Sequence, residues 1–137
     1  YDFLRDAGKA EEPQWLKDQM AAAPDAPALI SQLAAEGKAA ICNQTMKMFV
    51  SIYGAQTGNI ALSFWATGGI FLGGSVAAKN LSLMKDPIFM QSYLDKGRMA
   101  SLLKEMPITV VLNDDAGLIG AARYTLIEKA FRSQKRA

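Results

Sequence analysis

An uncharged stretch, residues 48–78, constrains this chain more than any other feature, because no Asp, Glu, Lys or Arg occurs in it. About 20 apolar residues are enough for a helix to cross a bilayer, so a membrane span has to be considered first. Glycines and side-chain amides interrupt the stretch, at Gly54, Gln56, Gly58, Asn59, Gly68, Gly69, Gly73 and Gly74. We therefore expect two buried elements separated by a break, with Gly54 and Gly58 letting a neighbouring backbone approach closely. A small helical membrane or scaffold protein built around this stretch is the alternative.

The first half of the chain has the pattern of helices. Residues 1–37 predict short helices, punctuated by Pro13, by Asp25 before Pro27, and by Gly37. Residues 38–66 predict one long helix, about 40 Å in length at 1.5 Å per residue. Its apolar residues recur at mostly three- and four-residue steps, at Ile41, Met48, Phe49, Ile52, Ile60 and Phe64.

Residues 67–137 predict two units, each a strand followed by a helix. The run Ile70-Phe71-Leu72 lies between glycine pairs, which is typical of a strand buried on both faces. Ser75 is expected to cap a helix that runs from Val76 to about Met84. The second strand, residues 108–112, leads through Asn113, Asp114 and Asp115, which are expected to cap a last helix reaching about Phe131. The expected buried face of that helix comprises Leu118, Ile119, Ala122 and Leu126.

Two such units joined by helices favour parallel strands with a crossover connection. Ligands of parallel sheets bind beyond the carboxyl ends of the strands. The residues that follow the two strands, Gly73-Gly74-Ser75 and 113–117, are therefore expected to meet at one edge of the sheet.

Charge and residue usage exclude several kinds of site. Lys and Arg total 15 against 13 Asp and Glu, so a net charge of +2 gives no reason to expect a nucleic acid or an acidic membrane as partner. The chain contains no histidine, which excludes His-based triads and His-ligated zinc. Cys42 is the single cysteine, so an internal disulfide is impossible and a reducing compartment is expected.

The glycine pair after the first strand is the most informative local motif. Without Cβ atoms at Gly73 and Gly74, a flat or bulky ligand such as a nucleotide can lie against the backbone, and a following helix start adds amide donors. A tight strand-to-helix turn with no ligand is the alternative. The motif is neither a dinucleotide fingerprint nor a Walker A loop. Asp114 and Asp115 could hold magnesium or act as a base, but their position before a helix favours capping.

Several separate motifs, taken in order along the chain, resemble the bacterial glucokinase family. They are Gly58-Asn59-Ile60-Ala61-Leu62, Ala66-Thr67-Gly68-Gly69-Ile70-Phe71-Leu72-Gly73-Gly74-Ser75-Val76-Ala77, Phe89-Met90, Leu94-Asp95-Lys96-Gly97-Arg98-Met99, Pro107-Ile108-Thr109-Val110-Val111-Leu112-Asn113 and Gly117-Leu118-Ile119-Gly120-Ala121-Ala122. The resemblance runs with consistent spacing from about Lys38 to Ala122, and more loosely from Tyr1.

The resemblance implies an α/β fold: a helix-rich C-terminal part of a ribonuclease H-like large domain of the actin-like ATPase type, with short parallel strands and crossover helices. Residues 1–137 would form one segment of that domain. It comprises short helices in 1–37, the long helix in 38–66, and two strand-helix units with nucleotide-side loops in 67–137. Members of the family transfer the γ-phosphoryl of ATP, with Mg²⁺, to the 6-hydroxyl of glucose. They do so in the cytoplasm, at the entry to glycolysis, and are usually homodimers.

The resemblance also implies where the site residues lie. Gly73, Gly74 and Ser75 fall on the positions that lie against the adenosine of ATP, although the family often has a third glycine where Ser75 stands. The catalytic aspartate, the phosphate-binding loop and the sugar site lie upstream in the family. No catalytic residue or metal ligand is therefore expected in this chain, which should be inactive alone, with Mg²⁺ held mainly by parts outside it.

The expected partners follow from the same resemblance. They are glucose and ATP for the full-length enzyme, the N-terminal part of that enzyme, and a second copy, with no nucleic acid and no membrane. The alternative function is a noncatalytic regulatory or nucleotide-binding module on a sugar-kinase scaffold.

Overall fold

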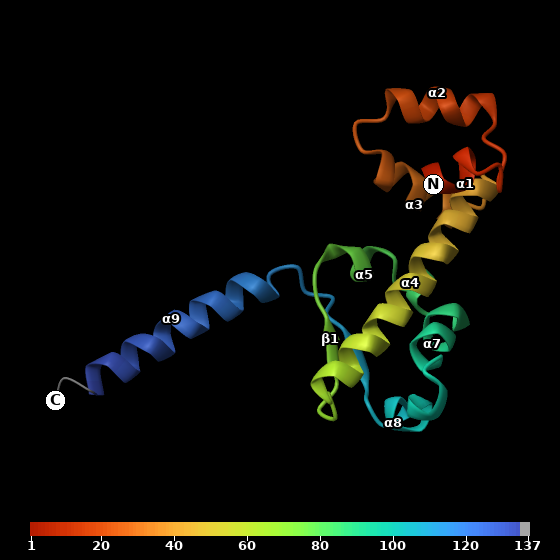
Figure 1. Cartoon of the computed structure of the whole chain (residues 1–137). Coiled ribbons are helices and arrows are strands. Elements are labelled where there is room, and N and C mark those ends of the chain that lie inside the picture. Colours follow the sequence, from red (N-terminus) through yellow and green to blue (C-terminus); the bar gives the residue numbers. More distant parts are fainter. Residues whose placement is uncertain (135–137) are drawn as a thin grey trace.

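The computed structural model describes the backbone of residues 1–134 and the side-chain surroundings of residues 1–127. It is mostly helical, with two short parallel strands. One long helix, α4 (Ala40–Phe64), forms the spine of the fold (Figure 1). Short helices gather at its N-terminal end, and the strands and the later helices lie along its C-terminal half.

The N-terminal helices are α1 (Asp2–Asp6), α2 (Gln14–Ala22) and α3 (Ala26–Ala35). The carboxylate of Asp25 accepts a hydrogen bond from the amide of Ala28 at 3.1 Å, which caps α3 as the sequence indicates. These helices share one apolar cluster with the start of α4, and its buried members include Leu4, Leu16, Ile30, Leu33, Ile41 and Cys42. This cluster fixes α3 against α4.

Helix α4 contacts α7 (Pro87–Leu94) backbone to backbone. A Cβ atom added at Gly54 would lie 2.3 Å from the carbonyl oxygen of Phe89, and one added at Gly58 would lie 2.5 Å from that of Tyr93. Both distances are far below van der Waals contact, so only glycine fits at either position. The prediction that these glycines admit a neighbouring backbone is confirmed.

The uncharged stretch is broken between elements, as expected: residues 48–64 lie in α4, residues 70–72 in a strand and residues 75–78 in the next helix. Helix α4 ends at Trp65, which adopts a left-handed conformation with φ of 52°, and β1 (Ile70–Leu72) follows. In the part of the chain that the structure describes, no helix is long and apolar enough to cross a membrane.

The two strands pair in parallel, with Ile70 opposite Ile108 and Leu72 opposite Val110 in β2 (Ile108–Val110). The connection between them is helical and contains α5 (Ser75–Lys79), α6 (Leu81–Met84), α7, the 3₁₀ turn η1 (Gly97–Met99) and α8 (Ala100–Lys104). The expected crossover is confirmed. Burial of β1 on both faces is not, because Leu72 packs with Val50 of α4 while Phe71 is 70% exposed on the other face.

The expected cap at Ser75 is wrong. Gly74 occupies the N-cap position, Ser75 is the first residue of α5, and no side chain caps that helix. Because Gly74 takes the N-cap position with a φ of 91°, Ser75 lies inside the first turn and not at the position from which a side chain caps the N2 or N3 amide. The helix also ends at Lys79 rather than near Met84, because Asn80 separates α5 from α6.

The expected buried face of the last helix is also wrong for this chain. Helix α9 (Ala116–Gln134) projects away from the other elements (Figure 1). Leu118 is 74% exposed and Leu126 is 69% exposed. An apolar helix face is buried only when another element packs on it, and no described element of this chain does so for α9.

Candidate functional site

The candidate site lies at the carboxyl edge of the two strands. The amide of Val111 donates a hydrogen bond of 2.9 Å to the carbonyl oxygen of Leu72, one residue past the end of the regular pairing. The chain leaving β2 therefore runs beside Gly73, and Asn113 follows two residues later. The two strand exits meet at one edge, as the parallel arrangement requires.

The glycine corner, Gly73-Gly74, is open. A Cβ atom built at either residue would have no heavy atom within 4 Å. Gly74 needs to be glycine for conformational reasons, since its φ of +91° is one that other residues rarely adopt. Gly73 does not have a positive φ, and no packing in this chain excludes a side chain there. Its missing side chain leaves space that the fold itself does not use.

A groove of about 660 Å³ adjoins this corner. Helix α5 forms one wall and α3 the other, and α4 lies between them. The residues that line it include Ser75, Val76 and Lys79 from α5, Ala28 and Ser31 from α3, and Met46 and Phe49 from α4. The groove is mostly apolar and of a size typical of small-molecule sites. Ser75 follows the corner directly and lines the groove, whereas Gly73 and Gly74 are not among its lining residues.

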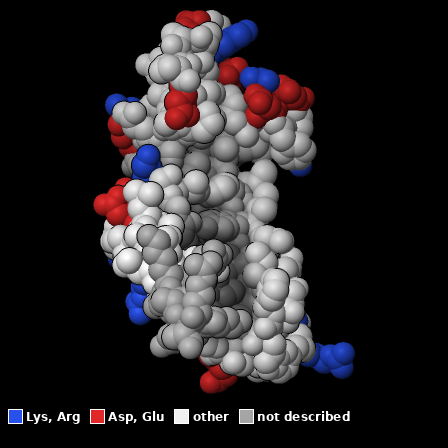
Figure 2. Space-filling view, turned by 90° about the vertical axis from the view of Figure 1, so that its left-hand side faces the viewer, with Lys and Arg blue, Asp and Glu red and all other residues white. Residues whose placement is uncertain are grey.

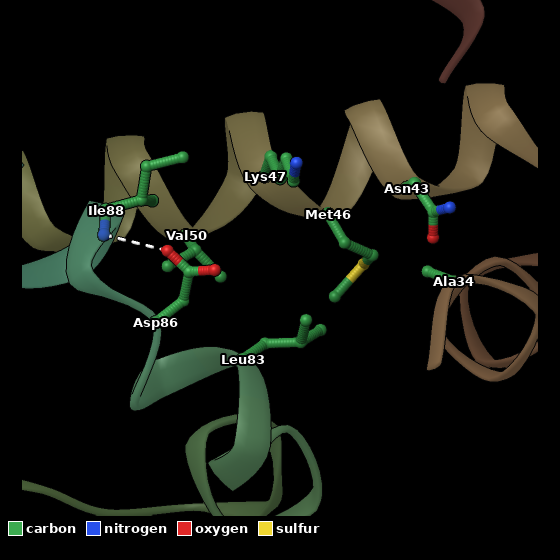
Figure 3. A pocket seen from close by; sticks show the side chains of 8 residues that line it. All are labelled: Ala34, Asn43, Met46, Lys47, Val50, Leu83, Asp86 and Ile88. Atoms are coloured by element: carbon green, nitrogen blue, oxygen red, sulfur yellow. Dashed lines mark hydrogen bonds between the residues drawn. The ribbon is translucent and has the colours of Figure 1, made fainter. Parts of the chain in front are cut away.

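A second cavity, of about 120 Å³, lies on the other side of Leu83, between α3, α4 and α6 (Figure 3). Its polar side chains are Asn43, Lys47 and Asp86. The Asp86 carboxylate accepts a hydrogen bond of 2.9 Å from the amide of Ile88, so it serves as the cap of α7. The space is too small for a nucleoside, and Asp86 already has a structural role.

The acidic residues and the cysteine do not group into one site within the described part of the chain. Asp114 and Asp115 are exposed in the turn before α9, where the Asn113 side chain accepts a hydrogen bond of 2.9 Å from the Asp115 amide. Across the described residues, no three His, Cys, Asp or Glu side chains are grouped as a metal site would need. Burial raises the pKa of the Cys42 thiol, which therefore stays protonated at neutral pH and is a poor nucleophile.

The sequence identified the corner residues but not the second wall of the groove. Gly73, Gly74 and Ser75 form a local motif that stands out after a strand. Ser31 and Ala28 precede that motif by more than 40 residues and belong to an ordinary helix. Their contribution arises from the packing of α3 on α4, for which the sequence carries no local signal.

Comparisons with known proteins identify the family. A family model described as Glucokinase matches residues 1–127. A glucokinase of Synechocystis is 44% identical over 106 residues, which are 77% of this chain and 30% of that protein. A glucokinase of Trichormus variabilis is 37% identical over 132 residues, which are 89% of this chain and 39% of that protein. A glucokinase-like protein of Xylella fastidiosa is 32% identical over 113 residues, or 80% of this chain.

The chain thus spans between 30% and 39% of the length of the first two relatives. The family model covers nearly all of the chain, including both strands, the glycine corner and the first turns of α9. This chain belongs to the glucokinase family.

Proposed function

We propose that this chain is the C-terminal segment of the large domain of a glucokinase and forms the adenosine side of its ATP site. Gly73, Gly74 and Ser75 are the residues assigned to that role. The observation that carries the proposal is the open glycine corner, which adjoins a groove of nucleoside size at the carboxyl edge of parallel strands. The family membership supplies the identity of the nucleotide.

The full-length enzyme would transfer the γ-phosphoryl of ATP to the 6-hydroxyl of glucose on an actin-like fold. Phosphoryl transfer depends on positioning and charge stabilisation from both sides of a cleft. This chain offers a surface for the nucleoside but no described cluster of acidic side chains that would hold Mg²⁺. Following the order of motifs in the family, we assign the metal, the catalytic base and the sugar site to other parts of the protein, and the chain alone is expected to be inactive.

Partners and location follow from the same proposal. Charged side chains gather at the upper end of the face that Figure 2 shows. Phe71 is 70% exposed and Leu118 is 74% exposed. Apolar area of this kind favours association. We assign the N-terminal part of the enzyme and a second subunit as partners, and the cytoplasm and glycolysis as the setting.

Calorimetric titration of ATP into the chain tests the nucleotide site. Gly73→Val is the most informative variant, because the added side chain enters the open space without forcing an unfavourable φ. We expect binding to the unmodified chain and a loss of at least about tenfold in Gly73→Val, since the side chain occupies the ligand's place. Gly68→Val is the matched control, because Gly68 is equally open and lies at the other end of β1.

The outcomes separate the possible functions. Equal ATP affinity in the chain and in Gly73→Val would contradict the assignment of the corner. Phosphorylation of glucose by the full-length protein is measured in a coupled assay. ATP binding without that activity would favour a noncatalytic nucleotide-binding module on the same scaffold.

A further inference from the structure

The two walls of the groove belong to parts of the chain that are otherwise packed separately. Helix α3 belongs to the apolar cluster of the N-terminal helices, while the buried Ala77 of α5 belongs to the cluster that contains Leu72 of β1. Leu83 contacts both clusters from a half-buried position. The width of the groove therefore depends on what connects α3 to α5.

One pair of side chains makes this connection. The hydroxyl of Ser31, in α3, donates a hydrogen bond to the side-chain oxygen of Asn80. Through its amide nitrogen, Asn80 also donates a hydrogen bond of 2.9 Å to the carbonyl oxygen of Val76 in α5. Both Ser31 and Asn80 are half-buried and line the groove. Among the described residues, no other side-chain hydrogen bond links α1–α3 to the segment after α4.

We propose that Ser31 and Asn80 are positioning residues that set the width of the groove for the base of the bound nucleotide. This inference rests on the proposed function. The amide nitrogen of Asn80 donates a hydrogen bond to a carbonyl oxygen of α5, and its side-chain oxygen accepts one from Ser31 of α3. The pair thus fixes the wall that carries Val76 and Lys79 relative to the wall that carries Ala28. The affinity for a base inserted between these walls depends on their separation, whereas the affinity for phosphate groups beyond the corner does not.

The test compares ATP with tripolyphosphate, which carries the phosphates without the nucleoside. Calorimetric titrations of both are made on the full-length protein, to which the phosphate-binding loop is assigned, and on its Ser31→Ala and Asn80→Ala variants. Loss of one hydrogen bond at the groove is expected to weaken ATP binding about two- to tenfold. Tripolyphosphate binding should not change. Combining the two substitutions should weaken ATP binding little more than either alone, because both remove the same link.

The matched control is a serine outside the groove. Ser101 lies in α8, outside the groove lining, and the described structure gives its side chain no hydrogen bond, so Ser101→Ala should leave ATP binding unchanged. Asn80→Asp is the second test variant. It keeps the oxygen that accepts from Ser31 but loses the donor to Val76, and we expect an ATP affinity between those of the unmodified protein and Asn80→Ala.

Two results would overturn the positioning role. One is unchanged ATP affinity in Ser31→Ala and Asn80→Ala. The other is a parallel loss of ATP and tripolyphosphate binding, which a merely structural defect would produce. If the unmodified protein binds no ATP at all, the proposed nucleotide site fails and the positioning role fails with it. If it binds ATP and both variants match it, only the positioning role fails.

Discussion

Gly54 of α4 lies directly against the carbonyl group of Phe89 in α7, so that a Cβ atom at position 54 would come within 2.3 Å of that oxygen. The same arrangement recurs one turn later, where Gly58 faces Tyr93. These two contacts let the backbones of α4 and α7 touch, and they set the position of the whole crossover segment relative to α4.

Gly54→Ala should therefore destabilise the fold. The methyl group meets backbone rather than a flexible side chain, so the helices have to move apart, at a cost of about 1–3 kcal/mol. Urea unfolding followed by circular dichroism measures the change. Gly120→Ala is the matched control, because Gly120 lies in α9 with open space around it and the substitution should raise helix stability by up to about 1 kcal/mol. Equal effects at both sites would contradict the backbone contact.

The hydroxyl of Tyr93 connects α7 to the segment before β2. The residue is fully buried, and its hydroxyl lies 3.3 Å from the carbonyl oxygen of Leu103 and 3.2 Å from that of Met106. Tyr93→Phe removes these contacts and should cost about 0.5–1.5 kcal/mol of unfolding free energy. Tyr124→Phe, at a position 68% exposed, should cost nothing measurable in the same urea titration.

Cys42 makes the stability of the fold sensitive to alkaline pH. Burial raises the pKa of its thiol in the folded chain. The unfolded chain then loses this proton above about pH 8.5 while the folded chain keeps it. Stability that is fully present below about pH 8.5 should decline as the pH rises further, by at most about 1.4 kcal/mol per pH unit. Cys42→Ala should reduce that decline between about pH 8 and 9.5, and the part that remains at higher pH is assigned to Tyr1 and Tyr93, because burial also raises the pKa of their hydroxyls. An unchanged slope in the variant would assign the decline to another group.

The exposed apolar face of α9 should make the isolated chain associate. Leu118 and Ile119 are 74% and 57% exposed, and we expect a dimer in light scattering at micromolar concentration. Leu118→Glu should shift the chain toward the monomer, because it places a charge in the apolar face. Gly120→Glu adds the same charge two residues along, on the opposite side of the helix, and should leave the dimer intact. A clean monomer for the unmodified chain would contradict this prediction.

The sequence predicts those parts of the fold that depend on neighbouring residues. Asp25 is recognisable as a helix start because its cap acts within three residues of itself, and its carboxylate accepts the amide of Ala28 as expected. The glycine corner was recognisable for the same reason. Parallel pairing of the strands followed from the helical residues between them, since a parallel connection needs a crossover.

The parts that the sequence did not predict depend on which faces are covered. Helix α4 carries apolar residues on every side, so periodicity selected Ile52 and Phe64, which are 61% and 79% exposed. Its buried residues include the small Gly54, Gly58 and Ala61, because the partner backbone approaches there. The expected buried face of α9 is wrong for a related reason. A sequence pattern shows that a helix is amphipathic but not whether another element covers its apolar face.

The contrast between Gly73 and Gly74 has a consequence for how the family diversifies. Position 74 is restricted by the backbone whether or not a ligand is bound, whereas position 73 is restricted only if something occupies the open space beside it. In lineages that have given up the nucleotide, drift should therefore introduce side chains at 73 first and leave 74 as glycine. The pattern of substitution at these two adjacent sites would distinguish selection on binding from selection on folding.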